Sequence, residues 1–303
     1  MTSNTKLIKL SIKILLEHIK YSLVSDKLFH KLRYKKAFNK PLNLNEPKTF
    51  SEKLIYLKLR YTNQLENLCA DKFEVCQYVT QCGYPEILKK IYKVYNDPND
   101  IDFDSLPDKF FVQCTHTQGH NFAIDKNKPY DLQHIKALYK VLFKRKHYMV
   151  LRENCYKHIK PRVICSEFLE QSDGSPLTDY KIYCFGGKAK YVMVSYGEYE
   201  HNVRNHKFDM QWNSIDSLFK KTPAVEAKSI QKPENFDKMV EIAEKLAAPF
   251  PHVRVDLYNI SGRIVFGELT FYSSGGFVNV QSDKMNEKIG SWIDLEKYKQ
   301  YMV

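Results

Sequence analysis

The spacing of hydrophobic and polar positions switches several times along the chain between a helical period and a strand period. Residues 1–60 favour helices that are interrupted around NKPLNLNEPKTF, with a helix starting after Ser51. Between residues 87 and 130 the pattern is that of short strands, and a polar loop through Gly119 joins the two strands of DKFFVQCTHTQGHNFAID. The helix LQHIKALYKVLFKR follows, with Asp131 as its cap. The first half of the chain therefore predicts helices around a small group of strands.

Strand patterns dominate the second half. PRVICSEFLE predicts one strand, and DYKIYCFGGKAKYVMVSY predicts a hairpin because Gly186-Gly187 suits a tight turn. A polar segment at 200–230 precedes the helix KPENFDKMVEIAEKLAAPF, a hairpin at 253–272 and a helical tail at 285–303. Strands and helices do not alternate regularly, so the predicted fold class is α+β, with antiparallel sheets and flanking helices.

The hairpin VRVDLYNISGRIVFGELTFY, residues 253–272, carries an acid in each strand. Arg254 and Asp256 share one face of the first strand, and Glu268 and Thr270 share one face of the second. A two- or four-residue loop would put the two acids on opposite faces. A three- or five-residue loop, or a bulge at Gly267, would bring them to one face as diagonal neighbours. We predict the odd loop or the bulge, because a shared cation requires both acids on one face.

Two carboxylates beside an arginine suit a site for magnesium and nucleotide phosphates, since Mg²⁺ commonly takes one or two protein carboxylates plus substrate phosphates. Acids on the solvent face of a two-stranded ribbon are also common, and the hairpin alone leaves both interpretations open. Two further features favour the nucleotide site. The glycine-containing loop after Cys114 offers backbone N–H groups to phosphates, and Lys181 lies among strand residues, where a lysine needs an anionic partner.

Length and composition indicate a globular protein of two lobes, with 303 residues of which 43% are hydrophobic. The seven cysteines form no C-x-x-C pair and no zinc spacing, which indicates a reduced, intracellular protein with free thiols. The net charge of +12 is concentrated in residues 1–60, which hold 14 Lys and Arg against 4 Asp and Glu. This imbalance suggests an anionic surface as a partner. Nucleic acid is not expected, because no aromatic and basic stacking motif appears.

The segment KLIKLSIKILLEHIKYSL predicts a basic amphipathic helix. One side carries the lysines at 6, 9, 13 and 20, and another carries Ile8, Ile12, Leu15 and Ile19. Lysines interrupt the apolar run, so the segment is a poor signal peptide and a poor membrane span. A helix lying on an anionic membrane through residues 6–24 is one interpretation. A helix packed on the body of the protein, with its lysine side in solvent, is the one that we favour.

Taken together in this order, several blocks resemble the TupA-like branch of the ATP-grasp superfamily, which occurs in gene clusters for bacterial cell-surface polysaccharides. The resemblance covers about residues 45–295. The blocks that carry it are NEPKTFSEKLIYLKL, ADKFEVCQYV, LPDKFFVQCTHTQG, RENCYKHIKPRVICSEFL, LTDYKIYCFGGKAKYV, RNHKFDMQWN and FPHVRVDLYNISGRIVFGELTFYSSGGF.

The resemblance implies an ATP-grasp fold, with two α+β lobes enclosing an ATP site. It implies a basic helical arm at 1–60 and a catalytic region at 61–303, with a small nucleotide-covering lobe at about 87–165. The residues implied at the nucleotide are Glu167 at the adenine amino group, the backbone of Phe168 and Leu169 around adenine, Lys181 at the phosphates, and the loop 115–119 over them.

At the reacting end, the resemblance implies that Arg254 stabilises the transferring γ-phosphate and that Asp256 and Glu268 hold Mg²⁺. Thr270 stands where the superfamily commonly has an asparagine metal ligand, and a hydroxyl is the weaker ligand. Gln113 stands where the family usually has a lysine, so it brings no charge to the phosphates. Either Lys181, His116 near Gly119, or another basic group compensates, or the member has lost activity.

The implied function is an ATP-dependent carboxylate–amine ligase that acts through an acyl phosphate. Its implied acceptor is a uronic acid of a polysaccharide precursor, and an amine is the second substrate. The segment 200–230 is the candidate substrate region, with His201, Arg204 and His206 among its residues. A cytoplasmic protein, peripheral on the inner membrane face, would suit this role. The alternatives are a non-catalytic or degenerate ATP-grasp protein that binds a polyanionic glycan or membrane, and a sugar kinase on the same fold.

Overall fold

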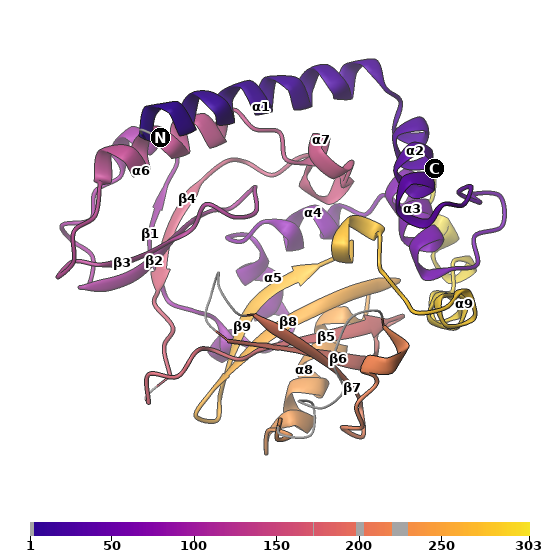
Figure 1. Ribbon diagram of the computed structural model, residues 1–303. Coiled ribbons are helices and arrows are strands. Elements are labelled where there is room, and N and C mark those ends of the chain that lie inside the picture. The colour runs from indigo at the N-terminus through magenta and orange to yellow at the C-terminus, as the bar shows by residue number, and fades with distance from the viewer. Residues whose placement is uncertain (1–2, 172, 198–202, 220–229) are drawn as a thin grey trace. The chain divides into compact units, whose positions relative to one another are not determined.

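The computed structural model describes residues 3–171, 173–197, 203–219 and 230–303 (Figure 1). His201 of the candidate substrate region lies outside these residues. The chain forms two compact units, and each is described by itself. The first unit comprises residues 1–29, 64–78 and 89–169, and the second comprises 30–63, 79–88 and 170–303. The expected arm at 1–60 and catalytic region at 61–303 stay predictions.

The first unit is built on a four-stranded antiparallel sheet with the strand order β1-β4-β2-β3. Its strands are β1 (Ile91–Tyr95), β2 (Lys109–Cys114), β3 (Phe122–Asp125) and β4 (Val163–Glu167). Its helices are α1 (Ser3–Leu23), α4 (Gln64–Ala70), α6 (Leu132–Phe143) and α7 (Tyr148–Leu151). Two more helices cross the boundary between the units, α2 (Asp26–Phe38) and α5 (Val75–Gln81).

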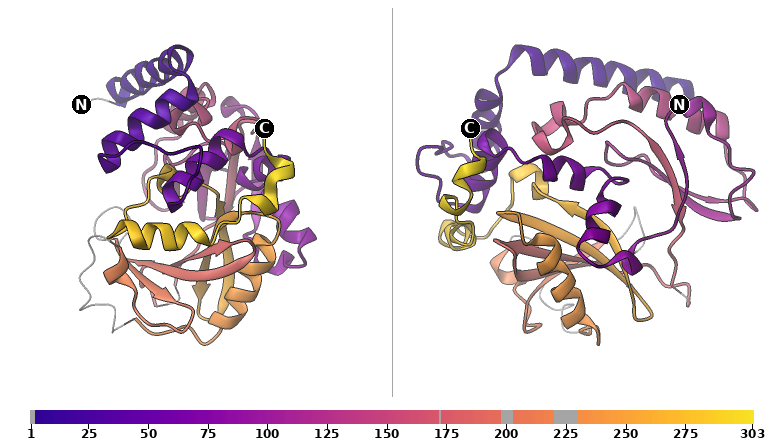
Figure 2. Two further views of the ribbon diagram at one scale, coloured as in Figure 1. Left: turned by 90° about the vertical axis from the view of Figure 1, so that its right-hand side faces the viewer. Right: turned by 180° about the vertical axis from the view of Figure 1, so that it is seen from behind.

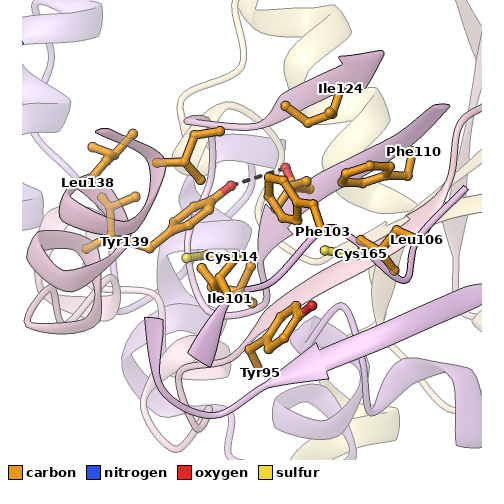
Figure 3. Close-up of a cluster of buried hydrophobic side chains, with 14 residues drawn as sticks. Tyr95, Ile101, Phe103, Leu106, Phe110, Cys114, Ile124, Leu138, Tyr139 and Cys165 are labelled. Carbon is orange, nitrogen blue, oxygen red and sulfur yellow. Dashed lines mark hydrogen bonds between the residues drawn. The ribbon is translucent and has the colours of Figure 1, made fainter. Parts of the chain in front are cut away.

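The core of this unit lies between α6 and one face of the sheet (Figure 3). Leucine, isoleucine and tyrosine recur at helical spacing along α6, so one side of the helix is buried. Tyr139 points into the cluster, and its hydroxyl donates a hydrogen bond to Val112 O at 3.2 Å (Figure 3). Phe110, Val112 and Cys114 alternate along β2 and face this core, which leaves Gln113 on the opposite face of the sheet.

The second unit contains a five-stranded antiparallel sheet with the order β7-β6-β5-β8-β9. Its strands are β5 (Asp179–Phe185), β6 (Lys188–Tyr196), β7 (Arg204–Asp209), β8 (His252–Ile260) and β9 (Arg263–Thr270). Helix α8 (Phe236–Ala247) packs its apolar side against β5, β6 and β8 (Figure 2). Helices α3 (Phe50–Arg60) and α9 (Asp283–Ser291) pack on each other in the same unit.

The register of β8 and β9 confirms the predicted bulge. The turn itself has two residues, Ser261 and Gly262, both with positive φ, which suits a tight hairpin. The pairing then shifts between Asp256 and Leu257, so that Gly267 is left without a partner residue. A Cβ at position 267 would lie 2.9 Å from Asp256 O, so only glycine fits the bulge without displacing the backbone. As a result Asp256 lies directly opposite Glu268, rather than diagonally as we expected.

Helix α1 packs on the first unit, as we expected, and the lysines at 6, 9, 13 and 20 are exposed. The side that packs is a third one, which the sequence interpretation did not single out. It carries Leu7 and Leu10, which pack against the core cluster, and the buried Ile14. The aliphatic row at 8, 12, 15 and 19 is exposed instead.

Candidate functional site

Polar side chains gather on the face of the five-stranded sheet opposite α8. Because side chains alternate along a strand, the pairing fixes which residues share that face. One row of directly paired residues crosses the whole sheet: Lys207, Met193, Lys181, Asp256 and Glu268. The adjacent row ends in Tyr183, Arg254 and Thr270. The structure therefore brings Lys181, Arg254, Asp256, Glu268 and Thr270 together, as the sequence interpretation required.

Arg254 connects the acids of this face. Its Nε donates to Asp256 Oδ1 and its Nη2 donates to Asp256 Oδ2, each at 2.6 Å, which is a bidentate pair. The same Nη2 lies 3.2 Å from Glu268 Oε1 and 3.0 Å from Thr270 Oγ1. Burial alone would lower the pKa of Arg254, but the charge of Asp256 and its hydrogen bonds raise this pKa well above its ordinary value. Arg254 is therefore a permanent cation between the two carboxylates.

Lys181 is the second cation of the face. Its Nζ donates to Asp256 Oδ2 at 3.0 Å and also contacts Asp179 Oδ2. Burial and the charge of Asp256 raise the pKa of Asp179 to about 6. Its other oxygen, Oδ1, is buried and has no hydrogen-bond partner within the described parts of the chain. With Asp179 ionised, three carboxylates contact the two cations Lys181 and Arg254, and this cluster has an excess of negative charge.

That excess, and the oxygen donors that carry it, fit a hard cation. Asp256 and Glu268 are directly opposite each other, and the Thr270 hydroxyl donates to Glu268 Oε1 at 2.9 Å. The described residues contain no group of three or more His, Cys, Asp or Glu that could hold a metal by itself. Mg²⁺ characteristically relies on one or two carboxylates and completes its shell with phosphate oxygens and water, so a pair of acids is the expected protein contribution.

In the first unit, the loop after β2 is fixed at its start and exposed at its tip. Thr115 N donates to Arg162 O at 3.0 Å, and the Thr115 hydroxyl donates to Lys160 O at 3.1 Å. Gly119 has a φ of +73° and is exposed, and a Cβ there would meet nothing within 4 Å. Gln113 is only 7% exposed, on the sheet face that points away from the hydrophobic core.

His116 is not the compensating cation that we considered. Its ring is buried, its Nε2 lies 3.0 Å from Leu142 O, and burial lowers its pKa to about 4. It is therefore neutral near pH 7. The sequence interpretation missed Lys72, whose Nζ donates to Thr117 O at 2.9 Å and so places a positive charge on this loop. The sequence offers little signal for Lys72, because it lies 45 residues from Thr117, the residue that it contacts.

The three residues predicted at adenine lie at the end of β4 and just beyond it. Glu167 N donates to Lys90 O at 2.8 Å, and Lys90 N donates to Glu167 Oε2 at 3.3 Å. The Glu167 carboxylate thus holds the start of β1. The ring of Phe168 lies 5.9 Å from Lys109 Nζ, and Leu169 is half-buried.

The structure does not bring the two predicted substrate residues to the polar face. His206 is buried, pairs with Val194 on the α8 side of the sheet, and places Nδ1 2.6 Å from Asp216 Oδ2. Arg204 is exposed at the start of β7, and it lies on the same face of the sheet as His206, not on the face of Lys207. The residues of β7 that do face the site side are Asn205, Lys207 and Asp209. Burial lowers the pKa of Lys207, whose Nζ lies 4.9 Å from the Phe219 ring.

Comparison with known proteins gives one family. A family model described as TupA-like ATPgrasp matches residues 52–294. No curated protein matches the chain.

Similar solved structures include D-alanine–D-alanine ligase from Bacillus anthracis complexed with ATP, with 13% identity, a TM-score of 0.45, and coverage of 84% of this chain and 75% of that one. The corresponding ligase from Helicobacter pylori has 12% identity, a TM-score of 0.42, and coverage of 84% and 67%. The ATP-grasp ligase PsnB, complexed with a minimal precursor, has 12% identity and a TM-score of 0.41. The match covers 77% of this chain and spans 63% of the length of PsnB.

The raised pKa of Asp179 predicts a pH dependence of stability. The folded protein holds this proton more tightly than the unfolded chain, in which the ordinary pKa is 3.8. The contribution of Asp179 to the free energy of unfolding is therefore fully present below about pH 4 and is lost as the pH rises through about 6. We expect Asp179→Asn to gain free energy of unfolding relative to wild type across that window. Urea unfolding at a series of pH values measures the difference.

The matched control is Asp237→Asn in the same unit, whose side chain is 91% exposed. The difference in free energy of unfolding between this variant and wild type should stay nearly constant with pH. A difference between Asp179→Asn and wild type that is equally flat would contradict the assignment.

Proposed function

We propose that this chain, which belongs to the TupA-like ATP-grasp family, is an ATP-dependent carboxylate–amine ligase. The observation that carries the proposal is the direct pairing of Asp256 with Glu268 across the Gly267 bulge, with Arg254 between them. A strand pair with a regular two-residue hairpin would have separated these groups onto two faces. The family match supports ATP as the phosphoryl donor, and the paired acids support Mg²⁺ as its companion.

In this proposal Asp256 and Glu268 hold Mg²⁺, with the Thr270 hydroxyl beside them. The metal supplies charge neutralisation at the β- and γ-phosphates. Arg254 binds the γ-phosphoryl oxygens, on which negative charge is spread during transfer, and Lys181 binds a neighbouring phosphate. Both cations are positioned before the substrate arrives, because each is already hydrogen-bonded to an acid of the same face.

The chemistry proceeds in two displacements. An oxygen of the acceptor carboxylate attacks the γ-phosphorus, the bond from this phosphorus to the β,γ-bridging oxygen breaks, and ADP leaves with that electron pair. The product is an acyl phosphate. The amine nitrogen then attacks the carbonyl carbon, the carbon–oxygen bond to phosphate breaks, and the nitrogen loses a proton to give an amide and inorganic phosphate. Asp179 is a candidate general base that accepts this proton, because a pKa of about 6 suits a base near neutrality.

The first unit contributes nucleotide contacts in this proposal. Glu167 and the backbone of Phe168 and Leu169 surround adenine, as the family resemblance implies. Gln113 and the tip of the loop at Gly119 lie at the phosphates. Since His116 is buried and neutral, we assign to Lys72 the positive charge that Gln113 lacks, because its ammonium group is bonded to this loop.

We assign the acceptor to the carboxylate of a uronic acid in a polysaccharide precursor. This choice rests on the family resemblance. Lys207, in the same cross-sheet row as Lys181, is the residue that we propose for the acceptor, in place of the buried His206. A partly desolvated ammonium group suits a carboxylate partner.

Mg-ATP should stabilise the protein, and Glu268→Gln should remove most of this effect. Ligand present at a hundred times its Kd adds about 2.7 kcal/mol to the free energy of unfolding. For a domain of this size each kcal/mol raises Tm by about 2–4 °C. Glu268 is the better test than Asp256, because its side chain is 39% exposed and its loss leaves Arg254 paired. Thermal unfolding with and without Mg-ATP measures the shift.

Glu244→Gln is the control, since this acid lies on α8 and bonds Lys188 on the other side of the sheet. It should keep the wild-type shift. A Glu268→Gln protein that keeps the full shift would count against the metal assignment.

Restoring a cation at position 113 should strengthen nucleotide binding. Charge-assisted hydrogen bonds are roughly twice as strong as neutral ones, and we expect Gln113→Lys to lower the Kd for Mg-ATP about tenfold. Gln113→Met has a similar volume and no charge, and it should not tighten binding. Calorimetric titration measures both. Equal Kd values for the two variants would show that position 113 does not face the phosphates. Binding by Gln113→Lys alone, with none by wild type, would support the degenerate alternative.

A further inference from the structure

The exposed side of α1 carries an unbroken row of large aliphatic side chains. Its members recur at intervals of three or four residues, which is one side of a helix. Their exposed fractions are 60% for Ile8, 52% for Ile12, 58% for Leu15, 58% for Leu16, 46% for Ile19 and 79% for Leu23. Single exposed aliphatic residues are ordinary on protein surfaces, whereas a contiguous apolar strip marks a contact surface.

The orientation of the row is fixed by specific contacts on the opposite side of α1. Arg145 Nε and Nη2 donate to the two carboxylate oxygens of Glu17 at 3.0 and 2.8 Å, and the two side chains are only 8% and 13% exposed. Ile14, one turn earlier, is buried. Rotating α1 to bury the aliphatic row would expose Ile14 and break this partly buried ion pair, which is costly. The row is therefore held outward.

The lysines of α1 lie beside this row. With about 100° of rotation per residue, positions 6, 9, 13 and 20 fall between the packed side and the aliphatic row. All four are exposed. Lysine stems can extend along an apolar surface while the ammonium groups reach toward anions at its edge. An apolar strip bordered by cations along one edge has the charge and polarity of a helix that lies in the headgroup region of a bilayer.

We propose that α1 is an in-plane docking surface for a membrane that contains anionic lipids. The aliphatic row enters the boundary between headgroups and acyl chains, and the lysines bind lipid phosphates. Among the residues that the structure describes, no helix carries an apolar stretch long enough to cross a bilayer, so the contact is a peripheral one. This inference does not depend on the ligase chemistry, because the proposed function assigns no role to any residue of α1.

The test is sedimentation of the protein with vesicles of phosphatidylcholine, with and without about a third phosphatidylglycerol. We expect binding to the anionic vesicles that weakens with salt. Ile12→Glu/Leu16→Glu should reduce the partition coefficient about tenfold or more, because the acids replace apolar contacts and repel the lipid charge. The matched control is Ser11→Glu/Ser22→Glu, which puts two exposed acids on the same helix, at the edge of the row opposite the lysines, and removes none of the aliphatic side chains. It should bind considerably better than the first variant.

A further variant, Lys6→Gln/Lys13→Gln, should lose the preference for phosphatidylglycerol. Since all these positions are exposed, each variant should keep the wild-type Tm, and this is checked first. Two results would overturn the proposal. One is binding that Ile12→Glu/Leu16→Glu leaves intact, which would reduce the effect to charge alone. The other is a lipid-independent dimer that the same variant dissociates, which would assign the row to a second copy of the chain.

Discussion

The contact between Arg254 and the paired acids Asp256 and Glu268 is the constraint on which the second unit depends. Two carboxylates directly opposite each other on neighbouring strands repel, and a sheet does not ordinarily tolerate this pairing. Here the guanidinium group of Arg254 reaches both, and Lys181 reaches Asp256 from the other neighbouring strand. The bulge at Gly267 and the cations are therefore parts of one solution. The bulge creates the repulsion by aligning the acids, and the two cations compensate for it.

The two faces of the same sheet have different roles: one packs against α8, and the other carries the candidate site. Val255 and Leu257 of β8 alternate with Arg254 and Asp256, so one strand supplies both the apolar surface under α8 and the charged surface opposite. Burial of the first face fixes the register of the strand, because a slip by one residue would turn the charged side chains toward α8 and the valine and leucine toward the polar face. The position of the candidate site is thus specified by the packing of α8 on the opposite face of the sheet.

The sequence allowed the α+β class and the hairpins to be predicted, because each of these depends on local spacing. Spacing alone left the register of β8 and β9 open, and the odd loop or the bulge was predicted because a shared cation requires both acids on one face. Gly267 was the one place in β9 where an extra residue could be accommodated without a side chain. The errors have a different origin. His116 looked like an available base within a polar loop, but its burial depends on Leu142, which lies 26 residues along the chain. The choice between His206 and Lys207 required the register of β7, where polar residues occupy both faces. For α1, the helical period identified the lysine side and the aliphatic row, but it did not single out the third side, with Ile14, which packs. The ion pair of Glu17 with Arg145, 128 residues along the chain, fixes that side.

The charge balance of the polar face also bears on how a nucleotide would enter it. Arg254 and Lys181 give their hydrogen bonds to Asp256, Glu268 and Asp179, so the cations that suit a phosphate are engaged by acids of their own face. Phosphate alone would have to displace these carboxylates from Arg254 and Lys181. The acids would then lie close together without a compensating charge, and this is costly because Asp256 is only 3% exposed. If Asp256 and Glu268 instead bind a divalent cation, the cation compensates their negative charge. Arg254 and Lys181 can then bind phosphate oxygens. A network of this kind favours the metal and the nucleotide together over either one alone, and it keeps the sheet stable while both are absent.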